Sequence, residues 1–202
     1  MNQQVEDIKA IRDMMEKSSK FLSLSGLSGI FSGIFAIAGA AFAYFYLLKD
    51  PAATDYTHQQ EVWILLLDAL LVLLLSIGFG VYFSWKKARK NKQILFSSVT
   101  WRVIYNLTIP LITGGIFSLM LLWRGDIGLV ISSTLIFYGL ALINTSKYTF
   151  NDIHYLGIIE IILGLIAAAF LHYGIIFWAI GFGFCHILYG WILYNKYDSK
   201  KK

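Results

Sequence analysis

Apolar runs of eighteen or more residues recur along this chain, and they constrain its fold more than any other feature. A helix of that length matches the hydrocarbon core of a bilayer, so each run predicts a membrane-spanning helix. Charged residues make up only 14% of the 202 residues, against about a quarter in soluble domains. The runs are continuous rather than alternating, which argues against the period-two wall of a β-barrel.

The sequence therefore predicts an all-α integral membrane protein with six transmembrane helices in three antiparallel hairpins, preceded by an amphipathic N-terminal helix. We expect a cytoplasmic amphipathic helix at 1–20, a transmembrane domain at 21–195 and a basic cytoplasmic tail at 196–202. Pro110 is expected to kink the third span. The six spans are expected at about 21–48, 62–85, 103–123, 127–146, 153–172 and 174–195.

The lysines and arginines indicate how the spans are oriented. With the N-terminus inside, fifteen of the seventeen fall on cytoplasmic segments, and only Lys49 and Arg124 fall outside. Cytoplasmic loops are enriched in these residues, so both termini are expected in the cytoplasm. Tryptophans near the expected span ends, such as Trp85 and Trp123, fit interfacial belts. The expected location is the plasma (inner) membrane, with a multi-pass chain.

Two ionisable residues lie deep inside the last two expected spans. Glu160 precedes the turn at Tyr173 by thirteen residues, and His186 follows it by thirteen, so both lie roughly 20 Å from the turn. Ionisable side chains inside a membrane are rare and usually paired. We expect Glu160 and His186 to meet, either as a structural hydrogen bond that fixes helix register or as a proton- or ligand-linked site.

Small residues share a helix face with each member of this pair. Gly157 and Gly164 lie on the face of Glu160, and Gly183 and Gly190 lie on the face of His186. Small residues allow membrane helices to approach closely. At matched depths, Gly157 should pack on Gly190 and Gly164 on Gly183.

Three further polar residues complete the candidate intramembrane site. Asp68 lies about two turns into the second span, where it has either a structural role, solvated or hydrogen-bonded, or a place in a pocket or ion pathway. Asn106 and Asn144 are equally far from Gly125, so an interhelical amide contact is expected near the cytoplasmic face.

Two polar segments are candidate contact surfaces. The loop after the second span is basic and lacks acids, which favours contact with anionic lipid headgroups; its members are Lys86, Lys87, Arg89, Lys90 and Lys92. Residues 4–20 form an amphipathic pattern that extends the first span, lies on the membrane or docks a protein partner. A homo-oligomer is a further expectation. Nucleic acid is not expected as a partner, because no recognition fold accompanies the basic residues.

The chain shows no catalytic or metal-binding motif. It has one cysteine, Cys185, and no histidine pair at metal spacing, so neither a cofactor nor a metal is expected. The leading hypothesis is a non-enzymatic structural or regulatory membrane partner. The alternative is a small proton-linked transporter or channel that uses Glu160 and His186.

The stretch from Ile8 to Gly29, IKAIRDMMEKSSKFLSLSGLSG, resembles a family of small bacterial multispanning membrane proteins of unknown function. The resemblance is concentrated in this stretch and in the general hydropathy. It implies a bacterial inner-membrane location, and it carries no activity, cofactor or catalytic residue to this chain.

Overall fold

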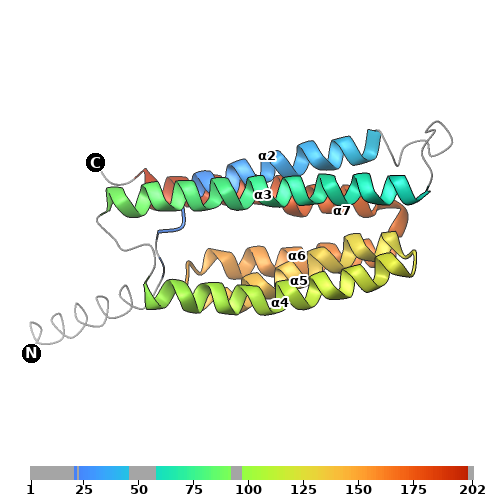
Figure 1. The fold of residues 1–202 in the computed structure, drawn as a ribbon. Helices are drawn as coiled ribbons and strands as arrows, with labels where there is room; N and C mark the ends of the chain where they lie inside the picture. The colour runs from blue at the N-terminus through green and yellow to red at the C-terminus, as the bar shows by residue number, and fades with distance from the viewer. Residues whose placement is uncertain (1–20, 22, 46–57, 92–96, 200–202) are drawn as a thin grey trace, which may run out of the picture.

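A computed structural model describes residues 21, 23–45, 58–91 and 97–199 (Figure 1). Every element in this part of the chain is helical. Six helical stretches are long and apolar enough to cross a membrane. The expected amphipathic helix at 1–20, Lys92 and residues 200–202 of the tail lie outside the described residues.

The first five stretches are single helices. They are α2 (Gly26–Ala43), α3 (His58–Lys90), α4 (Ser98–Trp123), α5 (Ile127–Ser146) and α6 (Asp152–Ala169). The sixth stretch, Leu171–Asp198, is called the last span below. It consists of a 3₁₀ turn η3 (Leu171–Tyr173), α7 (Gly174–Trp178), a π-helical segment η4 (Ala179–Cys185), α8 (His186–Leu193) and a second π-helical segment η5 (Tyr194–Asp198).

Several helix boundaries differ from the expected ones: α3 begins at His58 rather than at 62, and α4 begins at Ser98 rather than at 103. The first span begins at Gly26 rather than at residue 21, because Ser25 has an extended backbone and the Asp198 carboxylate accepts the N–H of Gly26 at 2.9 Å. A carboxylate in this position satisfies one of the free amides at a helix N-terminus. Helix α3 continues to Lys90, beyond the expected end at 85. Its last turn holds Lys, Ala and Arg, which favour helix and can extend their charged ends to water.

The helices form two groups that the last span joins. In Figure 1, α2 and α3 lie in the upper layer with the last span, and α4, α5 and α6 form the lower layer. Helix α4 packs on α5, α5 packs on α6, and the last span contacts both α6 and α2. Helices α3 and α4 lie at the two edges, where side chains such as Leu74 and Ile112 are exposed. Such apolar outer faces suit contact with lipid.

Aromatic side chains fill the contact between α2 and α3. Phe31 of α2 lies between Phe79 and Phe83 of α3, with ring centroids 5.3 and 5.2 Å away. Phe35 meets Phe79 edge to face at 5.0 Å. These separations are typical of favourable aromatic pairs. Helix α3 is therefore held to the bundle by interlocking rings along one side.

Glycines set the closest helix contacts, but not between the helices expected. A Cβ at Gly157 would lie 2.7 Å from the carbonyl oxygen of Gly139 on α5, so these two backbones touch. A Cβ at Gly190 would lie 2.6 Å from the carbonyl oxygen of Gly26 on α2. The expected pairing of Gly157 with Gly190 is therefore wrong. The glycine faces of α6 and the last span each pack on a different neighbour, α5 and α2.

The remaining expected pair, Gly164 with Gly183, is wrong for the same reason. Gly164 lies against Ile136 of α5, and Gly183 lies against Ile37 of α2.

Between α4 and α5 the chain turns through Gly125, whose φ of 85° favours glycine. Helix α4 runs unbroken through Pro110, and the kink there stays a prediction.

Candidate functional site

The structure brings Glu160 and His186 together inside the bundle. Glu160 lies in the middle of α6 with no exposed surface, and His186 is the first residue of α8. The Nδ1 atom of His186 lies 3.4 Å from Oε1 of Glu160, and the histidine side chain is 8% exposed. The contact follows from equal depth on two neighbouring helices. Its role stays a prediction.

Both nitrogens of the His186 ring have partners. Nδ1 lies 3.0 Å from the carbonyl oxygen of Gly181, which can only accept, so Nδ1 carries a proton. Nε2 lies 2.8 Å from the hydroxyl of Tyr138 on α5, which donates to it when the ring is neutral. The ring also stacks on Phe182 at a centroid distance of 5.9 Å. A neutral imidazole therefore fits this environment without a further partner.

Glu160 differs from its partner in how its polar atoms are satisfied. Neither of its carboxyl oxygens has a hydrogen-bond partner among the described residues. The carboxyl group packs against Gly181, where an added Cβ would overlap Oε2. Buried carboxyl oxygens without a partner are uncommon in folded proteins. Glu160 is therefore a buried polar group whose demand for a proton or a ligand is not met by the described residues.

The π-helical segment η4 shapes this site. It covers Ala179–Cys185 and contains Gly181 and Gly183. A π-helical turn is wider than an α-helical turn, and it exposes carbonyls that an α-helix would bond internally. Here Gly181, five residues before His186, presents its carbonyl to the imidazole. Single π-helical turns occur frequently at functional sites, which makes this part of the last span notable.

Sequence reasoning missed Tyr138 and Gly181. Tyr138 had a usable signal, because a tyrosine in the middle of an apolar span needs a partner for its hydroxyl. Gly181 had none, since it contributes a backbone carbonyl whose availability depends on the π-helical turn. The site is thus built from α5, α6 and the last span together.

Two cavities lie near the last span, and neither is lined by Glu160 or His186. One, of about 260 Å³, lies between α6 and α8 and includes Cys185 and Tyr189 in its lining. The other, of about 230 Å³, lies where the last span meets α2 and α3. With no exposed surface on Glu160, the pair occupies a closed seam between helices.

The three other predicted site residues lie elsewhere. Asp68 is half-buried on α3 beside Gly39 of α2, where an added Cβ would lie 3.2 Å from Oδ2. Asn144 donates to the backbone carbonyl of Asn106 at 3.0 Å. The five predicted polar residues therefore occupy three separate places: Glu160 with His186, Asn106 with Asn144, and Asp68 by itself.

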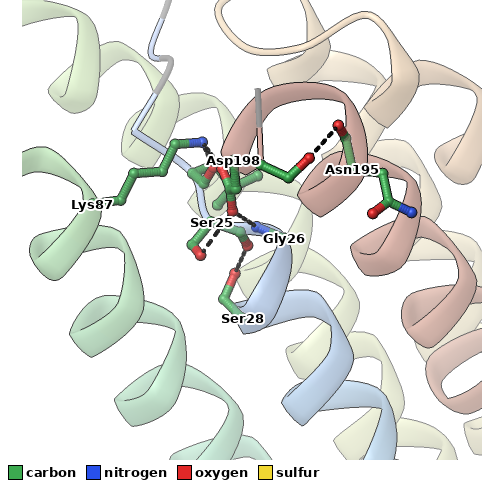
Figure 2. A network of polar contacts seen from close by, with 8 residues as sticks. Ser25, Gly26, Ser28, Lys87, Asn195 and Asp198 are labelled. Atoms are coloured by element: carbon green, nitrogen blue, oxygen red, sulfur yellow. Dashed lines mark hydrogen bonds and ion pairs between the residues drawn. The ribbon is translucent and has the colours of Figure 1, made fainter. Parts of the chain in front are cut away.

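A second polar cluster lies at the end of the bundle where α2 begins and where both α3 and the last span end. We call this the lysine-rich end, because it holds Lys86, Lys87, Lys90 and Lys196. Figure 2 shows Asp198 between Lys87 and the start of α2. Lys87 Nζ lies 2.6 Å from Asp198 Oδ1 and donates to the carbonyl of Leu24 at 2.6 Å. Asp198 Oδ2 also accepts from Ser25 Oγ at 3.3 Å. This network fastens three elements that are distant in sequence.

A smaller network joins the start of α6 to the end of the last span. Lys196 Nζ lies 3.0 Å from Asp152 Oδ2, and the hydroxyl of Tyr197 donates to the same oxygen at 3.0 Å. Tyr197 stacks on Phe150 at 4.1 Å. Lys196, near the end of the last span, is therefore neutralised by the carboxylate of Asp152.

The described residues contain no group of three or more His, Cys, Asp or Glu side chains able to hold a metal ion. Comparison with protein-family models, with curated proteins and with solved structures finds no match to this chain.

Proposed function

We propose that this chain is a non-enzymatic integral membrane protein that acts as a structural or regulatory partner within the plasma membrane. In this proposal six spans form three antiparallel hairpins behind an amphipathic N-terminal helix, and both termini are cytoplasmic. The six long apolar helices support the membrane placement. The resemblance of residues 8–29 supports a bacterial inner membrane.

The charge distribution supports the orientation. Lys87 of α3 and Lys196 of the last span belong to the lysine-rich end, where both make ion pairs. Arg124, in the turn between α4 and α5, lies at the other end (Figure 1). Excess lysine and arginine marks the cytoplasmic side.

The closed seam around Glu160 is the observation that carries the choice of function. A transport pathway needs water or substrate to reach its ionisable group. Glu160 has no exposed surface, and neither of the two cavities reaches it or His186. Enclosure of this kind suits a contact that fixes the register of α6 and the last span.

One observation favours the alternative of a proton-linked transporter. The Glu160 oxygens lack hydrogen-bond partners among the described residues, and they face the π-helical turn of the last span. A carboxyl group in this state could take up and release a proton if the last span moved. The two proposals differ in whether water reaches Glu160.

Cysteine accessibility separates the two proposals. In a Cys185→Ser background, which removes the lone cysteine, Glu160→Cys and Asp126→Cys are treated with a charged, water-soluble methanethiosulfonate reagent in detergent micelles. Only a thiolate reacts, and thiolates form where water enters. The Asp126 side chain is 46% exposed, so Asp126→Cys is the reference for a fully water-accessible cysteine.

For a closed seam, Glu160→Cys stays unlabelled while Asp126→Cys reacts completely. Labelling of Glu160→Cys at a rate near that of Asp126→Cys would overturn the structural role. Proton flux into liposomes under an imposed potential provides the second readout. Flux above that of empty liposomes, lost in Glu160→Gln, would establish the transporter instead.

A further inference from the structure

The cavity at the lysine-rich end has a mixed charged and apolar lining. It measures about 230 Å³ and lies between the start of α2, the last turn of α3 and the end of the last span. Lys86, Lys87 and Lys90 line it together with the apolar side chains of Leu27 and Phe83. Three lysines around one small cavity concentrate positive charge there, and the described residues of its lining include one carboxylate, that of Asp198.

Among the described residues, only one of these lysines has a neutralising partner. Lys87 is taken up by Asp198 and by the Leu24 carbonyl (Figure 2). Lys86 and Lys90 are exposed, and neither side chain makes a hydrogen bond or ion pair with any described residue. They are four residues apart on α3, and like charges at that spacing repel each other. A bound anion would remove this repulsion.

Neighbouring residues place the cavity at the depth of lipid headgroups. Trp85, directly before Lys86, is 46% exposed, and the Arg89 guanidinium lies 5.6 Å from its ring centroid. Exposed tryptophans near span ends mark the membrane interface. Phe83 lies about one turn closer to the bilayer centre than Lys86 and Lys87. The cavity therefore has a charged outer part and an apolar inner part.

We propose that this cavity binds the phosphate group of one anionic phospholipid. Lys86 and Lys90 contact the phosphate oxygens as point charges, and an acyl chain runs over Phe83 and Leu27. Lysines near a membrane surface attract anionic lipids, and here the cavity adds a defined position to that attraction. The inference rests on the membrane placement in the proposed function and does not depend on the role of Glu160.

Native mass spectrometry of the full chain in detergent tests the proposal. The protein is titrated with phosphatidylglycerol and, separately, with phosphatidylcholine, and bound lipid is counted. The test variant is Lys86→Gln/Lys90→Gln. Its matched control is Arg102→Gln/Lys147→Gln, which removes the same charge from exposed residues that do not line the cavity.

The expected result is one phosphatidylglycerol bound in preference to phosphatidylcholine. The test variant should weaken this binding at least about tenfold, with less than about twofold change in the control. Equal weakening in both variants, or no lipid preference in the unmodified chain, would overturn the proposal. Lys86→Arg/Lys90→Arg keeps the charge and should keep the bound lipid. Retained binding in this variant, together with loss in the test variant, shows that the loss comes from the removed charge and not from misfolding.

Inorganic phosphate separates the lipid from a free anion. Phosphate alone, titrated into lipid-free protein, should bind at least about tenfold more weakly than phosphatidylglycerol, because it lacks the acyl chain. Phosphate binding of equal strength, also lost in the test variant, would keep the anion site but overturn its assignment to lipid. Failure of the chain to co-sediment with phospholipid vesicles would instead contradict the membrane placement itself.

Discussion

The side-chain amide of Asn144 on α5 donates to the backbone carbonyl of Asn106 on α4 at 3.0 Å. Pro110, four residues after Asn106, has no N–H, so the usual helical partner of this carbonyl is missing. The side chain of Asn106 itself donates to the Arg102 carbonyl at 2.8 Å. The contact between the two asparagines thus compensates for a proline inside α4, and it involves a backbone acceptor rather than two amides.

Replacing Asn144 by leucine tests this compensation. In the unmodified chain, Asn144→Leu should lower the free energy of unfolding by about 1 kcal/mol, because the Asn106 carbonyl loses its donor. In a Pro110→Ala background, the new N–H supplies that donor, and the same change should have an effect near zero. SDS-induced unfolding of the unmodified chain, the two single variants and the double variant gives the coupling free energy between Asn144 and Pro110. Equal losses in both backgrounds would show that Pro110 is unrelated to the Asn144 contact.

The glycine contacts make a second prediction. Gly139→Ala places a methyl group 2.6 Å from the Gly157 carbonyl oxygen, so α5 and α6 must separate. The expected loss is about 1–3 kcal/mol of unfolding free energy. Gly80→Ala on α3 is the matched control, since nothing lies within 4 Å of its added Cβ. It should be neutral or stabilise by up to about 1 kcal/mol through helix propensity. Similar losses at both positions would contradict the α5–α6 contact.

The sequence predicts some parts of this fold well and others poorly. Apolar runs locate the six stretches, because a spanning helix must satisfy its backbone internally. The depths of Glu160 and His186 follow from counting residues along two helices. A glycine face, by contrast, shows that some helix approaches closely without showing which one. The sequence around Gly157 therefore does not show whether this glycine packs on α5 or on the last span.

Contacts between distant segments also escape sequence reasoning. Asp198 lies next to a run of lysines in a tail, which predicts solvation rather than burial. Its actual partners are Lys87 on α3 and the amide of Gly26 on α2. Neither can be inferred without knowing that the last span packs on α2. The π-helical turn at Gly181 is missed because no residue type specifies it.

Tyr138 provides the third prediction. Tyr138→Phe removes the hydroxyl that donates to Nε2 of His186, so the buried ring nitrogen loses its partner. The expected loss in unfolding free energy is about 1–2 kcal/mol. Tyr155→Phe is the control, because Tyr155 is 66% exposed and should change stability by less than about 0.5 kcal/mol. In a His186→Phe background, Tyr138→Phe should lose most of its effect. An unchanged effect there would exclude the hydrogen bond as the cause.

The ion pair of Lys87 and Asp198 gives the last prediction. The two charged groups lie 2.6 Å apart, and each side chain is only 12% exposed. Removing one partner therefore leaves the other charge partly buried, with neither an ion-pair partner nor full hydration. Lys87→Met and Asp198→Asn should each lower the unfolding free energy by about 1–3 kcal/mol, and the double variant should lose less than the sum. Asp198→Asn should also increase proteolysis before Gly26, since the start of α2 loses a carboxylate acceptor.

The pair of Lys196 and Asp152 is the matched comparison. Its side chains are 51% and 25% exposed, so the same double-variant cycle should give a coupling below about 1 kcal/mol. Raising the salt concentration to about 1 M should reduce this coupling further, because screening acts mainly on exposed charges. The Lys87–Asp198 coupling should persist at that concentration. If the two couplings are equal and equally sensitive to salt, the lysine-rich end is open to water, and Asp198 does not fasten α2 to α3.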